Sequence, residues 1–99
     1  MFTDSLTVSI TKNKETYKPY ENIRLTCQVS EDTAKSVQIV WMRDGKPLPS
    51  ENRFKQTEVN ELLIEGATGA DSGEYTCTAT HGQDEASASI SVTVEGGNF

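Results

Sequence analysis

The sequence lacks a long apolar run and carries little positive charge. No stretch approaches the roughly 18 apolar residues of a membrane-spanning helix. Residues 1–4 do not begin a signal peptide, so an extracellular protein with this sequence is expected to carry its targeting signal elsewhere. Nine Lys and Arg residues face fifteen Asp and Glu residues, which gives a net charge of −6. Nucleic acid and anionic membranes would repel such a chain. We therefore expect no nucleic-acid partner and no direct membrane insertion.

Residues that metal binding or catalysis would need are also scarce. His81 is the single histidine, and a solvated turn residue is favoured over a metal ligand or a base. The acidic pairs Glu31–Asp32 and Asp84–Glu85 do not have the spacing of a calcium loop, which favours ordinary surface charge. No nucleophile elbow or phosphate-binding glycine loop occurs. The sequence predicts a chain that is not an enzyme and has no cofactor and no metal site.

The helical period of apolar residues is missing, and alternation with a period of two takes its place. Such alternation is typical of strands that have one face in a core. The chain of 99 residues is long enough for one domain. We expect the inward-facing residues of the strands to be Leu6, Val8 and Ile10; Ile23, Leu25, Cys27 and Val29; Val37, Ile39 and Trp41; Leu62 and Ile64; Tyr75, Cys77 and Ala79; and Ala86, Ala88, Ile90, Val92 and Val94. Another short strand is expected over residues 53–57, and a turn or a switch between sheets over residues 13–15.

Two cysteines in a short domain leave two alternatives open. They form one disulfide in an oxidising compartment, or they remain buried thiols in the cytosol. No Asn-x-Ser/Thr glycosylation site occurs, which is compatible with either compartment.

The most informative stretch is residues 71–77, Asp-Ser-Gly-Glu-Tyr-Thr-Cys, together with Cys27 and Trp41. Trp41 follows Cys27 by 14 positions, and Cys77 follows Cys27 by 50 positions. Tyr75 lies two places before Cys77. With residues 25–27, 41–48, 53–54 and 62–64, this pattern resembles the intermediate-set (I-set) immunoglobulin module over about residues 5–95. About twenty residues separate Trp41 from Leu62, too few for the extra strands of a variable-type domain.

The resemblance implies an all-β fold, an immunoglobulin-like Greek-key β-sandwich of two antiparallel sheets. It implies a disulfide between Cys27 and Cys77 and a core that contains Trp41, Leu62 and Tyr75. It further implies a structural ion pair between Arg53 and Asp71. The expected organisation is an N-terminal extension over 1–4, the domain over 5–95 and a C-terminal tail over 96–99.

A candidate interface lies on the outward positions of the strands that contain Trp41, Cys77 and Ile90. That face has little charge and some exposed apolar groups, as a desolvated interface core requires. A plain β-surface of threonine and serine remains the alternative. The candidate residues are Val40, Met42, Thr76, Thr78, Ser89 and Ser91.

We expect a protein-binding and spacer module of a larger extracellular adhesion or matrix protein, flanked by similar modules. The alternative is a structural or docking module of an intracellular titin-like or obscurin-like muscle protein in the sarcomere. A glycan or antigen receptor is disfavoured, because the aromatics that could serve as exposed contacts do not cluster; these are Phe2, Tyr17, Tyr20 and Phe99. The partner is a protein. A homodimer is possible but not indicated. Pairing with another chain through the edge at residues 86–94 or through the edge near Tyr17 stays open, although Lys18 and Pro19 disfavour the second edge.

Overall fold

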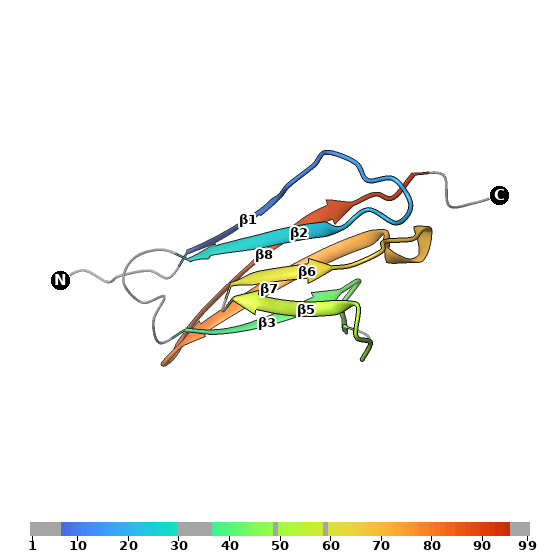
Figure 1. Ribbon diagram of the computed structural model, residues 1–99. Coiled ribbons are helices and arrows are strands. Elements are labelled where there is room, and N and C mark those ends of the chain that lie inside the picture. The colour runs from blue at the N-terminus through green and yellow to red at the C-terminus, as the bar shows by residue number, and fades with distance from the viewer. Residues whose placement is uncertain (1–6, 30–36, 49, 59, 96–99) are drawn as a thin grey trace.

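The computed structural model describes residues 7–29, 37–48, 50–58 and 60–95, with the side chain of Glu58 left out. Its strands are β1 (Val8–Lys12), β2 (Ile23–Val29), β3 (Gln38–Arg43), β4 (Lys46–Pro47), β5 (Phe54–Glu58), β6 (Glu61–Ile64), β7 (Gly73–His81) and β8 (Asp84–Val92). They form two four-stranded sheets, in the orders β1-β2-β6-β5 and β4-β3-β7-β8, which pack against each other (Figure 1). All pairs of neighbouring strands are antiparallel. The predicted all-β sandwich of two antiparallel sheets is confirmed.

The alternation in the sequence becomes burial in the structure. In β2, Ile23, Leu25 and Cys27 are fully buried, whereas the alternate residues Arg24, Thr26 and Gln28 are exposed or half-buried. The same parity holds in β7, and the inner faces of the two sheets meet in one core. Members of this core are Tyr17, Ile23, Leu25, Cys27, Trp41, Leu62, Ile64, Ala67, Tyr75, Cys77, Val92 and Val94.

A disulfide links the two sheets at the centre of this core. It joins Cys27 of β2 to Cys77 of β7, whose Cα atoms are 6.3 Å apart. Trp41 of β3 lies beside Cys77 in the sheet register and is 4% exposed. The structure thus pairs the two cysteines as the resemblance to the I-set module implies.

Most predicted strands match the observed ones to within a residue or two at their ends. The expected strand over 53–57 is β5, which starts at Phe54 instead. Between β6 and β7 the chain forms a short 3-10 helix, η2 (Gly69–Asp71). Leu6, the acidic pair Glu31–Asp32, the extension 1–4 and the tail 96–99 lie outside the described residues.

Of the two alternatives expected over residues 13–15, a turn or a switch between sheets, the structure shows the switch, and Tyr17 fixes it. β1 pairs with β2, whereas Tyr17 forms a parallel bridge with Val94 beyond the end of β8. Tyr17 is fully buried, and its hydroxyl donates a hydrogen bond of 2.6 Å to Oδ1 of Asn13. Burial raises the pKa of this phenol. The expectation that Tyr17 could serve as an exposed aromatic is therefore wrong.

Tyr20 has a strained backbone and an exposed ring. The amide of Glu21 donates to the carbonyl of Lys18, so Tyr20 is the third residue of a turn over residues 18–21. Its φ is 72°, a value that glycine adopts without cost and a bulky residue does not. Its side chain is 81% exposed. Tyr20 therefore contributes strain to the fold without contributing burial.

Replacing Tyr20 with glycine is expected to stabilise the domain. The strain relieved is about 1–2 kcal/mol, and the extra chain entropy of glycine offsets about 0.5–1 kcal/mol. A net gain of about 0.5–1 kcal/mol in the free energy of unfolding follows, measurable by urea denaturation. Tyr20→Phe keeps both the ring and the strain, so it is the matched control and should stay within about 0.5 kcal/mol of wild type. A glycine variant less stable than wild type would contradict this interpretation.

Candidate functional site

The outward face of the β4-β3-β7-β8 sheet brings the candidate interface residues together. The strand registers place Met42, Thr76 and Ser89 in one row across β3, β7 and β8. Val40, Thr78 and Ser87 form the next row. We call the six residues of these two rows the neutral patch.

The neutral patch combines exposed methyl groups with few charges. Val40 is 54% exposed and, with Tyr20, is one of two large hydrophobic side chains found exposed among the described residues. Met42, Thr76 and Thr78 are half-buried, and the hydroxyls of Thr76 and Ser89 are 2.8 Å apart. Charge appears at both ends, with Glu74 opposite Ser91 and Glu85 opposite Thr80. Such a surface costs little to desolvate at its centre and keeps acidic groups at its rim.

The structure alters the predicted set at two positions. Ser91 lies beyond the patch, opposite Glu74, and its backbone carbonyl accepts a hydrogen bond from Nζ of Lys12. Ser87, which sequence reasoning did not select, lies next to Thr78. The sequence feature that could have identified Ser87 is the hairpin turn. A two-residue turn at Gly82 and Gln83 sets the pairing of Thr78 with Ser87.

The outward face of the other sheet has a different character. Leu63 of β6 is paired with Arg24 of β2 and Lys55 of β5. Arg24 forms an ion pair of 3.1 Å with Glu61, and Lys55 forms one of 3.1 Å with Glu65. Its charges are thus mutually compensated around a half-buried leucine, which is typical of a solvated surface.

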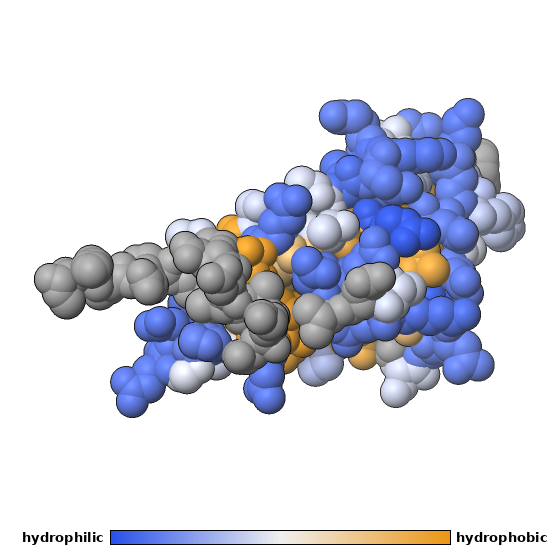
Figure 2. All heavy atoms as spheres, turned by 60° about the vertical axis from the view of Figure 1, so that its left-hand side comes forward, coloured by the Kyte–Doolittle hydropathy of each residue, from blue (hydrophilic) through white to orange (hydrophobic). Residues whose placement is uncertain are grey.

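On the side turned forward in Figure 2, hydrophilic residues cover most of the described surface, and hydrophobic residues appear in a few separate places. Exposed apolar area is therefore scarce on this side of the molecule. Among the described residues, Val40 is one of two exposed large hydrophobic side chains, which makes it a distinctive feature of the neutral patch.

Asp71 organises the corner that leads into β7. Its carboxylate accepts two parallel hydrogen bonds from the guanidinium of Arg53, at 3.0 and 3.2 Å, and one of 2.9 Å from the amide of Thr68. Asp71 is 1% exposed, and its hydrogen bond raises the pKa of Arg53. The backbone carbonyl of Asp71 accepts the hydroxyl of Tyr75 at 2.7 Å. Burial raises the pKa of this phenol. The role of this network is to hold β7, and with it one strand of the neutral patch.

Gly73 lies against the turn between β3 and β4. Its φ is 156°, and a Cβ at this position would lie 2.8 Å from Oδ2 of Asp44. Oδ1 of Asp44 accepts the amide of Glu74 at 3.0 Å, and the amide of Asp44 donates to the carbonyl of Glu74 at 2.8 Å. Glycine is needed here because the turn and the start of β7 approach each other closely.

The described residues offer little support for a catalytic or metal-binding site. His81 is half-buried at the end of β7, opposite Asp84. No cluster of three or more potential metal ligands occurs among the described residues. The buried indole N–H of Trp41 has no hydrogen-bond partner in the described part of the chain. Trp41 therefore acts through packing.

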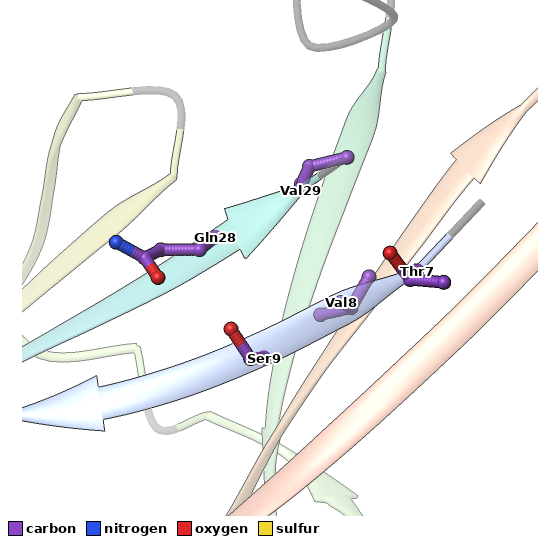
Figure 3. Close-up of a pocket in the computed structure, with 5 residues that line it drawn as sticks. All are labelled: Thr7, Val8, Ser9, Gln28 and Val29. Atoms are coloured by element: carbon purple, nitrogen blue, oxygen red, sulfur yellow. The ribbon is translucent and has the colours of Figure 1, made fainter. Parts of the chain in front are cut away.

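A hollow of about 260 Å³ lies where β1 pairs with the end of β2 (Figure 3). It is lined by Thr7, Val8, Ser9, Gln28 and Val29. None of these side chains is charged or titrates near neutral pH, so the lining supplies no acid, base or metal ligand. Within the described ranges, no helix is long and apolar enough to span a bilayer.

The comparison with protein families identifies the class of this domain. The model of the immunoglobulin I-set domain matches residues 6–94. The chain belongs to the immunoglobulin I-set family.

Relatives come from two groups of large proteins. The chain is 40% identical to titin of Drosophila melanogaster over 72% of its length, and 38% identical to neurofascin of Gallus gallus over 72%. It is 33% identical to slow-type myosin-binding protein C of Homo sapiens over 84%. To the nearest percent, the chain spans 0%, 5% and 8% of these three proteins. Its relatives therefore include both cell-adhesion and muscle proteins that are far longer than this chain.

Solved structures agree on the fold. The ectodomain of mouse nectin-like molecule 4 matches with a TM-score of 0.71 and 26% identity, over 96% of this chain and 32% of that one. A single domain of titin matches with a TM-score of 0.69 and 19% identity, over 88% of this chain and 97% of that one.

Proposed function

We propose that this domain is a non-catalytic protein-binding and spacer module of a larger extracellular adhesion or matrix protein. The observation that carries the proposal is the neutral patch, in which Val40 of β3 is 54% exposed. Protein interfaces are depleted of charge at their core and polar at their rim. The neutral patch has this arrangement, whereas the ion-paired face of the other sheet does not.

The mechanism is rigid presentation. The disulfide and the Asp71 network fix β7 in the sandwich, and the strands on either side take their register from it. In Figure 1, β1 begins near one end of the sandwich and β8 finishes toward the other. A domain with this polarity suits a chain of successive modules, in which each one spaces and orients its neighbours.

Two observations bear on the compartment. The disulfide between Cys27 and Cys77 favours an oxidising environment and hence the extracellular proposal. Similarity to titin and to myosin-binding protein C favours the alternative, a structural or docking module of an intracellular muscle protein. The sandwich and the neutral patch serve either role.

A charge placed in the neutral patch is expected to abolish binding. In the double variant Val40→Glu and Met42→Glu, two carboxylates would have to be desolvated on association, and each should weaken affinity by about tenfold or more. The measurement is quantitative mass spectrometry of the source-tissue proteins that are retained by the immobilised domain. Proteins retained by wild type and lost from the double variant identify the partner.

Thr11→Glu is the matched control, because Thr11 is exposed on β1, in the other sheet. It adds the same charge and should retain the same proteins as wild type. If the folded double variant retains the wild-type set, the neutral patch is not the interface.

A further inference from the structure

β8 is an edge strand of which part is already occupied by the chain itself. In the order β4-β3-β7-β8 it has β7 on one side. On its other side, the amide of Tyr17 donates to the carbonyl of Thr93 at 3.0 Å, and the amide of Glu95 donates to the carbonyl of Tyr17 at 2.7 Å. The ammonium of Lys12 donates to the carbonyl of Ser91 at 2.8 Å. The outer edge at the end of β8 is therefore already occupied, by the backbone of Tyr17 and by the side chain of Lys12.

The start of the same edge has no strand partner among the described residues. Backbone groups of alternate residues point to the same side of a strand. The contacts above show that the backbone groups of residues 91, 93 and 95 point away from β7. The backbone groups of Glu85, Ser87 and Ser89 therefore point away from β7 as well. The two-residue turn agrees with this parity, because it makes His81 and Asp84 a hydrogen-bonded pair. Among the described residues, no backbone hydrogen bond occupies the outer edge at these three positions.

We propose that the edge of β8 over residues 85–89 accepts an extended basic segment of another protein as an additional strand. The side chains along it are small, and residues 84–92 contain no proline or lysine that would protect the edge. In Figure 1, β8 diverges from β1 toward its start. Backbone hydrogen bonds supply the affinity in this mode of recognition, and alternate side chains supply the specificity.

Charge complementarity defines the occupant. Asp84 and Glu85 are exposed at the start of the edge, and the chain carries a net charge of −6. A lysine or arginine opposite Glu85 forms a favourable cross-strand pair. A second copy of this chain brings the same acidic residues and the same net charge, which oppose association. A basic partner segment fits the edge better than self-pairing does.

The test uses a synthetic peptide as long as β8 in which valine alternates with lysine and threonine, and a counterpart with glutamate in place of lysine. Amide hydrogen exchange, followed by nuclear magnetic resonance, is expected to slow by about tenfold or more at Glu85, Ser87 and Ser89 when the basic peptide is added. The acidic peptide should leave these amides unchanged. Unchanged exchange at all three amides in excess basic peptide overturns the proposal.

Ser87→Pro removes an outward-pointing amide that does not bond to β7, so the variant is expected to fold. Its affinity for the basic peptide, measured by fluorescence anisotropy, should fall by about tenfold or more. Ser50→Pro, in the exposed segment between β4 and β5, is the matched control and should bind like wild type. Equal binding by a folded Ser87→Pro variant contradicts the proposal. Concentration-dependent dimerisation of wild type that Ser87→Pro abolishes also overturns it, because the occupant is then a second copy.

Discussion

Replacing Cys27 and Cys77 with alanine is expected to lower the free energy of unfolding by about 2–5 kcal/mol. The bond joins positions separated by 50 residues, so it restricts the unfolded chain strongly. The chain-entropy estimate for a loop of this length is about 4 kcal/mol. Both cysteines are fully buried in the core, so the alanines also remove packed atoms. A domain of this size has about 5–15 kcal/mol of stability in total, so the variant should unfold at a much lower urea concentration.

Reduced wild type separates the two contributions. It loses the bond but keeps both sulfur atoms in the core, and its stability should lie between those of the oxidised protein and the double alanine variant. The comparison is made by urea denaturation of all three proteins, with a reducing agent in one sample of wild type. Equal urea midpoints for oxidised and reduced wild type would show that the disulfide does not stabilise the domain.

Replacing Arg53 with glutamine is expected to cost about 2–3 kcal/mol. Removing one partner of a fully buried ion pair costs about 3–5 kcal/mol, because the remaining charge is left without compensation. Here the side chain of Arg53 is 35% exposed, and Arg43 lies 3.7 Å from the same carboxylate, so water and a second cation reduce the loss. Asp71 is 1% exposed and still requires a partner. Urea denaturation measures the change.

A double-mutant cycle with Asp71→Asn isolates the pair, and its coupling energy should exceed about 1 kcal/mol. Lys55→Gln is the matched control, because it breaks an ion pair with Glu65 in which both side chains are more exposed, at 52% and 43%. Exposed pairs contribute about 0–1 kcal/mol. If Arg53→Gln costs no more than Lys55→Gln, the Asp71 corner does not depend on this ion pair.

The strands and the core could be predicted from the sequence because one physical rule governs both. Residues such as Leu25, Cys27 and Tyr75 alternate with polar neighbours, and a strand with one buried face produces this alternation. The turn between β3 and β4 was also predictable from its residues, Asp44 and Gly45. In the structure they adopt positive φ values of 51° and 79°. A hairpin turn of this type favours such residues.

Other features depend on contacts between distant segments and could not be predicted. Tyr17 is followed by Lys18 and Pro19, which suggested an exposed edge. It is buried because the segment crosses to the other sheet and bridges to Val94. Ser87 is an intermediate case, because its place in the neutral patch follows from the two-residue hairpin turn and not from alternation within one strand. The positive φ of Tyr20 contradicts the usual preference of the residue, so no local rule predicts it.

The redox state of Cys27 and Cys77 in protein isolated from its natural source tests the proposed extracellular role most directly. Free thiols are blocked on extraction, and mass spectrometry then shows whether the two cysteines are bridged or modified. A module of an extracellular adhesion or matrix protein should yield the bridged form. Two blocked thiols would contradict the extracellular proposal and favour a module of a cytosolic muscle protein.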